Sequence, residues 1–592
     1  MSAPAAADPS LARLADAILI PPFPGTRAPA WVLAALGEGL AGVTLFGPNI
    51  SGTGQLAALA GRLRAAGTEP VIAIDEEGGD VTRIAHRKGS SYPGNAALGA
   101  VDDVTLTEAV YRALGADLAA LGINVDLAPS ADVNTAADNP VIGTRSFGSD
   151  TALVARHAAA AVRGLQAAGV AACAKHFPGH GSTRSDTHHA VALVEGTLAD
   201  VIRRDLPPFE AAIAAGVRAV MPGHLRVPEL TGDLPASLSA AALTGLLRGD
   251  LGFTGVIVSD ALEMRAVSRP AGIPEAAVLA VAAGTDVLCF GRDQDELTYL
   301  AVRDALVTAV ADGRLPGRRL EEAAARVAEL RAWTAARPVP VSPVPVSPVP
   351  VSPVPAGPIP AARVRSGRVP AGRIPAGPVS AGKAPAGPIS AGKAPAGPAP
   401  AGPVPAGTSP SGPAPDGEAG PAPEGQAGPA PEGQAGPAPE GEAAPAPRGE
   451  VGLIAARRAV RVEGAVRPAA NPLVVEIVPP ANIAVGTVPW GLGSWVPRGS
   501  VRRVSTAAAR QAAPSVLTAA AGRPLIIVVR DAHRYRAARD LVTALLRARP
   551  DAVVVEMGLP AWRPPAAAYI ATYGAARTSG RAAAEVLGLA RR

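Results

Sequence analysis

The chain is poor in cysteine and lacks long apolar runs, and each shortage excludes a class of structure. Among 592 residues there are only two cysteines, Cys173 and Cys289, and each lies inside an apolar stretch. We therefore expect buried free thiols and no disulfide framework. No run of 18 or more apolar residues occurs, which argues against a membrane-spanning helix. The N-terminus lacks a basic segment followed by an apolar core, so we expect no signal peptide and a cytoplasmic location.

Charge of one sign is not concentrated anywhere. The chain has 55 Lys and Arg against 50 Asp and Glu, a formal net charge of +5, and the two signs are mixed along its length. A nucleic-acid partner would require a basic stripe, so none is expected. Apolar residues make up 48% of the sequence, enough for a sizeable core, and the length predicts two or more domains.

Composition divides the chain into three parts. Residues 1–335 alternate short apolar runs with helix-forming stretches, and residues 336–449 repeat "VPVSP", "PAGP" and "AGPAPEGQ". Frequent Pro and Gly prevent a packed core, so we expect a disordered, partly polyproline-like linker, with a binding region for an unknown partner as the alternative. Residues 450–592 have the composition of a globular domain. A strand–helix–strand unit of a parallel α/β sheet is predicted there from the segments "RPLIIVVRD", "YRAARDLVTALLRARP" and "DAVVVEMG".

The first part predicts a (β/α)8 barrel. Eight short apolar runs alternate with helical stretches: "AILIPPF", "GVTLFG", "PVIAIDEE", "GINVDLAP", "GVAACAKHF", "VRAVMPGH", "TGVIVSDA" and "TDVLCFG". A doubly wound open sheet is the alternative. Polar residues collect where these strands end, at Asp75, Asp126, Lys175, His176, His224, Asp260 and Asp286. Such residues ring the active site of a barrel, which favours that fold.

Asp260 is a candidate nucleophile. It follows the apolar run 255–258, so a strand would hold its carboxylate rigidly at the mouth of the barrel. The structural alternative is a helix N-cap, and for Glu263 we favour a capping-box role with Ser259 or Asp260.

The stretch "AKHFPGHGSTRSDTHH", residues 174–189, holds four of the eight histidines. In Asp186-Thr187-His188 the aspartate is placed to orient the imidazole, which makes the pair a candidate general acid/base. A metal site and a solvated loop are the alternatives. Because no H-E-x-x-H or C-x-x-C element is present and Lys175 would repel a cation, we expect neither a metal nor a cofactor.

Four segments together resemble a known family. "KHFPGHGSTRSDTHH" is similar to the K-H-F-P-G-H-G-x-T-x-x-D-[ST]-H loop of family 3 glycoside hydrolases of the bacterial β-N-acetylglucosaminidase type. Three further segments of that family, in the same order, resemble "IAIDEEGGDVTRI", "NPVIGTRSFGSD" and "GVIVSDALEM" of this chain. The resemblance implies a retaining mechanism in which Asp260 is the nucleophile, His188 the general acid/base and Asp186 its partner. It also implies sugar-binding roles for Asp75, Arg83, Arg145, Lys175 and His176, and His224 occupies a strand-end position that the family often uses.

The sequence departs from the family pattern at four positions. Glu76 and Asp80 stand where the family commonly has Gln and Arg, Ser182 replaces a frequent Asp, and Thr187 is a conservative replacement of a frequent Ser. The C-terminal part resembles the second, α/β sandwich domain of two-domain members. Because a polyproline-like linker of this length could span up to ~300 Å, we expect this domain not to dock in the family's usual way. Because the proposed nucleophile and acid/base pair all lie in the first part, the N-terminal domain is expected to be active alone.

The resulting prediction is a retaining exo-β-N-acetylglucosaminidase that acts on muropeptides, other peptidoglycan fragments or chitooligosaccharides. A phosphorylase on the same scaffold, a non-catalytic scaffold and a metal-dependent hydrolase are the alternatives. The loop that carries Asp186 and His188 is expected to move during turnover.

Overall fold

The computed structural model describes residues 9–185, 191–337, 448–467, 470–482 and 484–590. These residues all belong to one compact unit. The predicted linker falls between α12 (Gly317–Ala335) and α13 (Arg448–Ala459), and residues 338–447 lie outside the described part of the chain. The exact domain boundaries given above therefore stay predictions.

All eight strands predicted for the first part are present. Six form one parallel sheet in the order β2 (Gly42–Leu45), β3 (Val71–Ile74), β4 (Val125–Asp126), β5 (Ala171–Phe177), β7 (Ala219–Pro222) and β9 (Val256–Ile257). The other two, β1 (Leu19–Ile20) and β10 (Leu288–Cys289), pair in parallel with each other. Every strand is buried, which explains why most strand positions are apolar.

Two further backbone contacts connect the pair to the sheet. Val258 and Val287 form a parallel bridge between the ends of β9 and β10, and the Thr44 N–H of β2 lies 3.3 Å from the Pro21 carbonyl after β1. The strands therefore follow one another around a ring in sequence order, as predicted for the barrel. A doubly wound sheet would reverse its strand order near the middle, and no such reversal occurs among the described strands.

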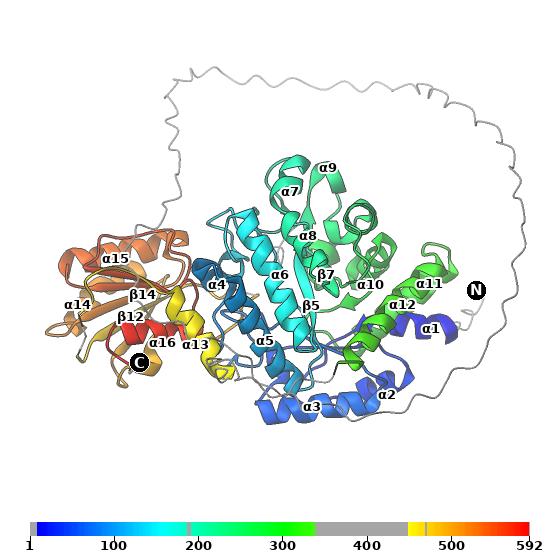
Figure 1. Ribbon diagram of the computed structural model, residues 1–592, viewed down its shortest axis with the longest axis horizontal. Coiled ribbons are helices and arrows are strands. Elements are labelled where there is room, and N and C mark those ends of the chain that lie inside the picture. Colours follow the sequence, from blue (N-terminus) through cyan, green and yellow to red (C-terminus); the bar gives the residue numbers. More distant parts are fainter. Residues whose placement is uncertain (1–8, 186–190, 338–447, 468–469, 483, 591–592) are drawn as a thin grey trace, which may run out of the picture. The chain divides into compact units, whose positions relative to one another are not determined.

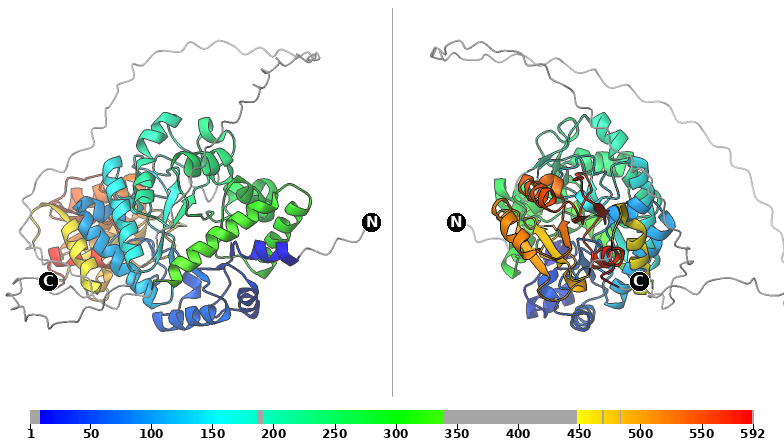
Figure 2. Two further views of the ribbon diagram at one scale, coloured as in Figure 1. Left: turned by 45° about the vertical axis from the view of Figure 1, so that its right-hand side comes forward. Right: turned by 90° about the vertical axis from the view of Figure 1, so that its left-hand side faces the viewer.

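Helices lie outside the strand ring (Figures 1 and 2). Asp103, Asp150 and Asp295 cap α5 (Val104–Ala120), α6 (Thr151–Ala167) and α11 (Glu296–Ala311), each accepting a hydrogen bond from a backbone N–H in the first helical turn. A two-stranded parallel ribbon, β6 (Ala192–Leu193) with β8 (Leu225–Arg226), and a π-helix over Ala241–Asp250 were not predicted. The helices of this domain are α1 (Pro9–Asp16), α2 (Ala30–Glu38), α3 (Thr53–Ala66), α4 (Asn95–Val101), α5 (Val104–Ala120), α6 (Thr151–Ala167), α7 (Leu198–Arg204), α8 (Pro207–Ala214), α9 (Pro228–Thr231), α10 (Arg265–Ala283), α11 (Glu296–Ala311) and α12.

The C-terminal domain is an α/β sandwich around a mixed sheet. Its order is β11 (Arg461–Gly464), β16 (Ala568–Ala571), β15 (Val553–Glu556), β14 (Leu525–Val529), β12 (Leu473–Val478) and β13 (Val501–Ser505). The predicted unit of β14, α15 (Arg536–Ala548) and β15 is confirmed. The sheet is not wholly parallel as predicted, because the edge strand β11 pairs antiparallel with β16.

Both faces of this sheet are covered, which explains the unbroken apolar run of β14. Leu525, Ile527 and Val529 pack with residues of α14 (Ala509–Ala519) and α15, whereas Ile526 and Val528 pack toward α16 (Arg577–Val586). In Figure 1, α15 and α16 lie on opposite sides of the strands. The two free cysteines are buried, as expected. None of the described helices is long and apolar enough to cross a membrane.

The C-terminal domain docks on the N-terminal domain despite the long linker. Val451 and Ala455 of α13 are buried in the hydrophobic core of the N-terminal domain, and α13 packs against α4 and α5 as well as α16. A Cβ atom on Gly452 would lie 2.1 Å from the Ser91 carbonyl oxygen, so the two backbones are in close contact. The strand–helix periodicity of each domain gave no indication of this interface.

Asp286 does not lie at the active-site end of the strands, and that expectation is wrong. It comes before β10 and not after it, so it sits at the opposite end of the ring. Its fully buried carboxylate accepts from the Ile257 N–H at 2.9 Å, Arg319 at 2.5 Å and Arg326 at 3.1 Å, and it also pairs with Arg248. Asp286 is therefore the shared counter-charge of three arginines.

Replacing Asp286 by Ala should destabilise the domain strongly. Arg248, Arg319 and Arg326 would then lose their shared buried counter-charge, with only the half-exposed Glu322 left beside Arg319, and removing one partner of a buried ion pair costs about 3–5 kcal/mol. The free energy of unfolding from denaturant titration measures this loss. Asp312→Ala is the matched control, because the Asp312–Arg314 pair is solvent-exposed and should contribute nothing measurable. Equal stability of the two variants would contradict this account.

Candidate active site

A cavity of about 760 Å3 lies at the carboxyl ends of the strands. Its lining includes six of the predicted site residues, which come from segments far apart in the sequence: Asp75, Arg83, Arg145, Lys175, His176 and Asp260. The structure thus brings these residues together as expected. The cavity is within the size range of sites that hold small ligands.

Lys175 is the centre of a buried ion cluster. Its Nζ atom lies 2.8 Å from Asp75 Oδ1 and 2.8 Å from Glu77 Oε1, and its side chain is only 2% exposed. Glu77 also accepts two hydrogen bonds from Arg145, at 2.9 and 2.7 Å. Two cations thus balance two carboxylates, as buried charges require. We call Asp75, Glu77, Arg145 and Lys175 the Lys175 cluster.

The charges of the Lys175 cluster keep one another ionised. Burial alone would raise the pKa of Asp75 and of Glu77. The positive charges of Lys175 and Arg83 nevertheless hold the pKa of Asp75 below its ordinary range. The charges of Arg145 and Lys175 do the same for Glu77. Burial would lower the pKa of Lys175, but the two carboxylates raise it. All members are therefore charged at neutral pH, and all four line the cavity.

The turn after β3 explains why Asp75 and Glu77 act together. The two side chains are two positions apart at a strand end and so point to the same side, whereas Glu76 between them points away. Gly78 and Gly79 then turn the chain with φ of 73° and 58°, and a Cβ on Gly79 would lie 2.4 Å from the Gly94 Cα. Sequence reasoning missed Glu77, although this alternation within "DEEGGD" was the available signal.

His176 is held by Asp132, a second residue that sequence reasoning missed. The His176 Nδ1 atom lies 2.8 Å from Asp132 Oδ2, and Asp132 also accepts from the backbone N–H groups of His176 and His180 and from the Ser130 hydroxyl. Because a carboxylate only accepts, Nδ1 carries a proton and Nε2 is the atom nearest Arg145, at 3.4 Å. Burial would raise the pKa of Asp132, but the contacts with His176 and His180 hold it low.

Asp260 follows β9 and lines the cavity. Its Oδ1 accepts from the Ala261 N–H at 2.8 Å. Helix α10 begins at Arg265 with Met264 at its N-cap, so neither Asp260 nor Glu263 caps it, and the capping interpretation is wrong. Glu263 instead accepts from the Gly291 N–H at 2.6 Å and lines the same cavity.

His224 is fully buried and is not among the described residues that line the cavity. Its Nδ1 lies 2.8 Å from the Ser237 hydroxyl, and its Nε2 lies 3.1 Å from the carbonyl of Ala261, next to Asp260. This position suits a residue that supports the Asp260 segment. A direct contact between His224 and a sugar stays a prediction.

The predicted acid/base pair lies outside the described residues. The described chain ends at Ser185 and resumes at Val191, so Asp186 and His188 fall in the gap, and their roles and the motion of their loop stay predictions. His180, which is described, has its pKa lowered to about 4, chiefly by burial. It is therefore neutral at neutral pH.

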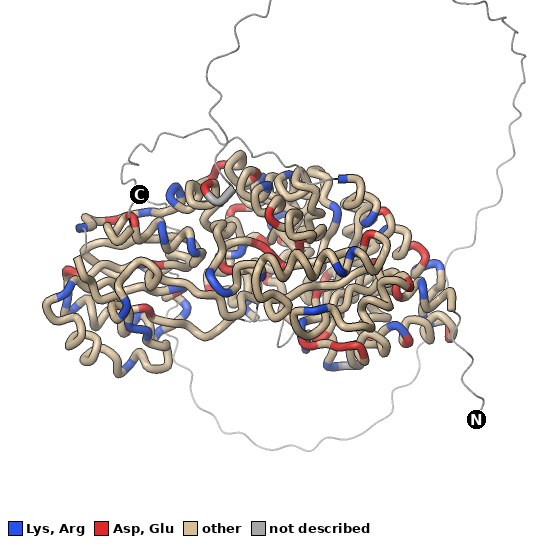
Figure 3. The backbone as a smooth tube through the Cα atoms, turned by 90° about the horizontal axis from the view of Figure 1, so that it is seen from below, with Lys and Arg blue, Asp and Glu red and all other residues tan. Residues whose placement is uncertain are grey.

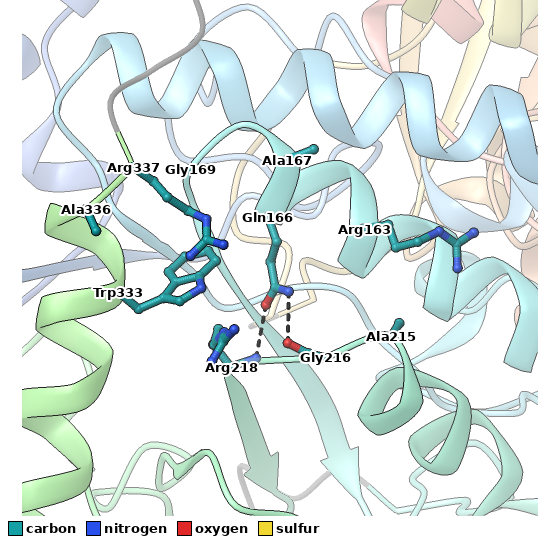
Figure 4. A pocket seen from close by; sticks show the side chains of 10 residues that line it. All are labelled: Arg163, Gln166, Ala167, Gly169, Ala215, Gly216, Arg218, Trp333, Ala336 and Arg337. Atoms are coloured by element: carbon teal, nitrogen blue, oxygen red, sulfur yellow. Dashed lines mark hydrogen bonds between the residues drawn. The ribbon is translucent and has the colours of Figure 1, made fainter. Parts of the chain in front are cut away.

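A second cavity in the described part of the chain contains none of the predicted site residues. This cavity, of about 500 Å3, lies at the opposite ends of β5 and β7, and its lining includes Arg218, Arg337 and Trp333 (Figure 4). The Gln166 side chain there donates a hydrogen bond to the Gly216 carbonyl and accepts one from the Arg218 N–H. Acidic and basic residues are interspersed along the backbone (Figure 3). Within the part of the chain that the structure describes, no group of three or more His, Cys, Asp or Glu is arranged to hold a metal.

Comparison with known proteins shows consistent similarities. The family model for the glycosyl hydrolase family 3 N-terminal domain matches residues 31–330. "Beta-hexosaminidase A" of Pseudoalteromonas piscicida is 33% identical over 318 residues, which is 49% of this chain and 53% of that protein. The chain thus covers about half the length of that relative. "Beta-hexosaminidase" of Stenotrophomonas maltophilia is 36% identical over 288 residues, covering 47% of this chain and 84% of that protein.

A solved structure is similar over both domains. It is a glycoside hydrolase family 3 β-N-acetylglucosaminidase from a Paenibacillus species, with a TM-score of 0.73 and 27% identity. The alignment covers 98% of this chain and 96% of that one.

Glu76 generates a prediction about pH. It accepts from the backbone N–H groups of Arg83 and Ile84, and its own N–H donates to Asp126, whose pKa burial also raises. Burial raises the pKa of Glu76 to about 7, against 4.5 for an ordinary glutamate. The stability that Glu76 contributes by staying protonated is complete below pH 4.5 and is lost as the pH rises through 7.

Glu76→Gln should therefore stabilise the protein at high pH only. The gain should be negligible below pH 4.5 and reach about 3 kcal/mol well above pH 7, because the amide keeps the hydrogen bonds without a buried charge. Denaturant titrations at pH 5 and pH 8 measure the difference. Glu77→Gln is the control and should destabilise at both pH values, since Glu77 is ionised at both. A gain for Glu76→Gln that is the same at pH 5 and pH 8 would refute the explanation.

Proposed function

Because the chain belongs to glycoside hydrolase family 3, we propose that it is a retaining exo-β-N-acetylglucosaminidase. Its substrates would be chitooligosaccharides or peptidoglycan fragments that end in β-linked GlcNAc. The relatives named as β-hexosaminidases and the similar β-N-acetylglucosaminidase structure support this activity. No observation favours the phosphorylase alternative. The cytoplasmic location and a partner for the linker stay predictions.

The position of Asp260 relative to the Lys175 cluster carries the proposal. In the ring order β1, β2, β3, β4, β5, β7, β9, β10, the strand before Asp260 and the strand before Asp75 are four positions apart. These carboxylates therefore stand on opposite sides of one cavity. A sugar between them can present its anomeric carbon to Asp260 and its hydroxyl groups to the cluster.

The chemistry is a double displacement. Asp260 attacks the anomeric carbon as the bond to the leaving oxygen breaks, and His188, supported by Asp186, protonates that oxygen. The result is a glycosyl–Asp260 ester. His188 then takes a proton from water, which attacks the same carbon and releases GlcNAc and free Asp260. Two inversions give net retention of configuration.

The Lys175 cluster supplies binding and orientation. Ionised Asp75 accepts hydrogen bonds from sugar hydroxyls, while Arg83, Arg145 and Lys175 donate to them. His176, fixed through Nδ1, offers Nε2 as a further partner. Because the cluster is charge-balanced before the sugar arrives, little reorganisation is needed on binding.

Trapping with a 5-fluoro GlcNAc donor tests the nucleophile. Mass spectrometry of the digested enzyme should find the sugar on the peptide that carries Asp260. Asp260→Ala should show no labelling and should lower turnover of 4-nitrophenyl GlcNAc on the order of 10^4-fold. Asp304→Ala is the control. Asp304 is an exposed acidic residue on α11, so this variant should be labelled normally. A label on any other residue, or full activity of Asp260→Ala, would overturn the assignment.

The products distinguish hydrolysis from phosphorolysis. In phosphate buffer the enzyme should release free GlcNAc, because water is the proposed acceptor for the glycosyl–Asp260 ester. Quantifying GlcNAc and GlcNAc-1-phosphate by chromatography measures the ratio. A product that is mainly the sugar phosphate would replace the hydrolase proposal by the phosphorylase alternative.

A further inference from the structure

We infer that the C-terminal domain closes the cavity at the end that receives the non-reducing terminus, so that it restricts the enzyme to single-residue exo-cleavage. The inference deepens the proposed function and rests on it. The closing surface, which we call the wall segment, consists of residues 481–482 and 484–488 of the C-terminal domain. All seven of these residues line the cavity that contains Asp75, Lys175 and Asp260.

The wall segment contacts a proposed sugar-binding residue directly. The Arg83 Nη2 atom lies 3.5 Å from Asp75 Oδ2 and donates to the Ala484 carbonyl at 3.1 Å. Asn482 fixes the segment, because its Nδ2 donates to the Pro140 carbonyl at 2.9 Å while its Oδ1 accepts from the Ala484 N–H at 2.9 Å. One guanidinium thus joins the Lys175 cluster to the second domain.

The order of the strands shows which end of the bound sugar would lie next to the wall segment. The anomeric carbon must lie at Asp260, after β9, whereas Asp75 and Arg83 follow β3 on the opposite side of the ring. The far end of the sugar, with the C4 hydroxyl, therefore faces Asp75 and Arg83. In a β-1,4-linked chain a preceding sugar would extend from that hydroxyl, and the wall segment behind Arg83 occupies its path.

The C-terminal domain that carries the wall segment is joined to the N-terminal domain by further contacts. Asp80 Oδ1 accepts from the Ala575 N–H at 2.9 Å, and its Oδ2 lies 3.2 Å from Arg530. The Arg577 N–H donates to the Ser90 carbonyl at 3.1 Å, and Arg458 pairs with the N-cap residue Asp103 at 2.7 Å. Asp80 is 6% exposed, so its charge needs these partners.

The unusual carboxylate at position 80 fits this arrangement. Where the resembling family commonly has Arg, this chain has an acid that meets Arg530 of the second domain. A basic residue at position 80 would place two guanidinium groups together at a buried site. Asp80 and Arg530, which are not among the described residues that line the cavity, are therefore positioning residues that act by holding the C-terminal domain, and with it the wall segment, against the N-terminal domain.

The test is the pattern of products from 4-nitrophenyl β-chitobioside. The full-length wild-type enzyme should first release GlcNAc and leave 4-nitrophenyl GlcNAc, so free nitrophenol should follow only after a lag. In a full-length variant with residues 484–488 replaced by Gly-Gly, chitobiose and nitrophenol should form together from the start. The initial nitrophenol rate, relative to the rate with 4-nitrophenyl GlcNAc, should rise about tenfold, equivalent to about 1.4 kcal/mol.

A second variant guards against local misfolding of the altered segment. Arg530→Ala should shift the product pattern in the same direction and raise KM more than it lowers kcat, and Arg530→Lys should restore both in part. Arg563→Ala, which breaks an exposed pair with Glu463 at 2.6 Å in the same domain, should behave as wild type.

The outcomes are separable. Wild-type product patterns in both the shortened and the Arg530→Ala variants would overturn the wall assignment. Loss of all 4-nitrophenyl GlcNAc hydrolysis in both variants, with folding verified by circular dichroism, would also overturn it, because a wall governs chain length and not bond cleavage. Absence of GlcNAc release by the wild type from either substrate would instead overturn the proposed function itself.

Discussion

The ammonium group of Lys175, buried between Asp75 and Glu77, is the interaction on which the rest of the site depends. A buried cation costs several kcal/mol unless counter-charges meet it. Both carboxylates, at 2.8 Å, and the Arg145 guanidinium on Glu77 must therefore hold their positions for the strands to pack as they do. This requirement ties the turn after β3 to β5 and to the segment after β4. The same groups that stabilise the ring of strands also line the cavity in which we propose that the sugar binds.

Four acidic residues in one short stretch differ in protonation and in partner because their surroundings differ. Asp75 and Glu77 face cations and stay ionised, whereas burial favours the protonated form of Glu76. Asp80 leaves the cavity altogether and meets Arg530 of the second domain. The stretch "DEEGGD" thus contributes two ionised groups to the cavity, one buried carboxyl that favours the protonated form, and one contact with the second domain. The effect of a substitution at any of these four positions should therefore depend on the partner that the carboxylate has there.

The sequence allowed prediction of the strands and of the residues that follow them, because short apolar runs and strand-end polar residues are local signals. It did not allow prediction of partners that are distant in the chain. Asp132 was missed because its link to His176 spans 44 positions, and Asp286 was assigned to the wrong end because composition does not distinguish the start of a strand from its end. The antiparallel edge strand β11 is too short and polar to stand out. Docking of the second domain depends on shape, as at Gly452, which no periodicity encodes.

The orientation of the sugar across the ring is the central claim, and a crystal structure of the enzyme with GlcNAc bound tests it most directly. The account predicts the anomeric carbon about 3–3.5 Å from a carboxylate oxygen of Asp260. It also predicts the C4 hydroxyl against Asp75 and Arg83, with the wall segment behind it. A sugar turned end for end, with its anomeric carbon at Arg83, or one bound outside this cavity, would contradict the account.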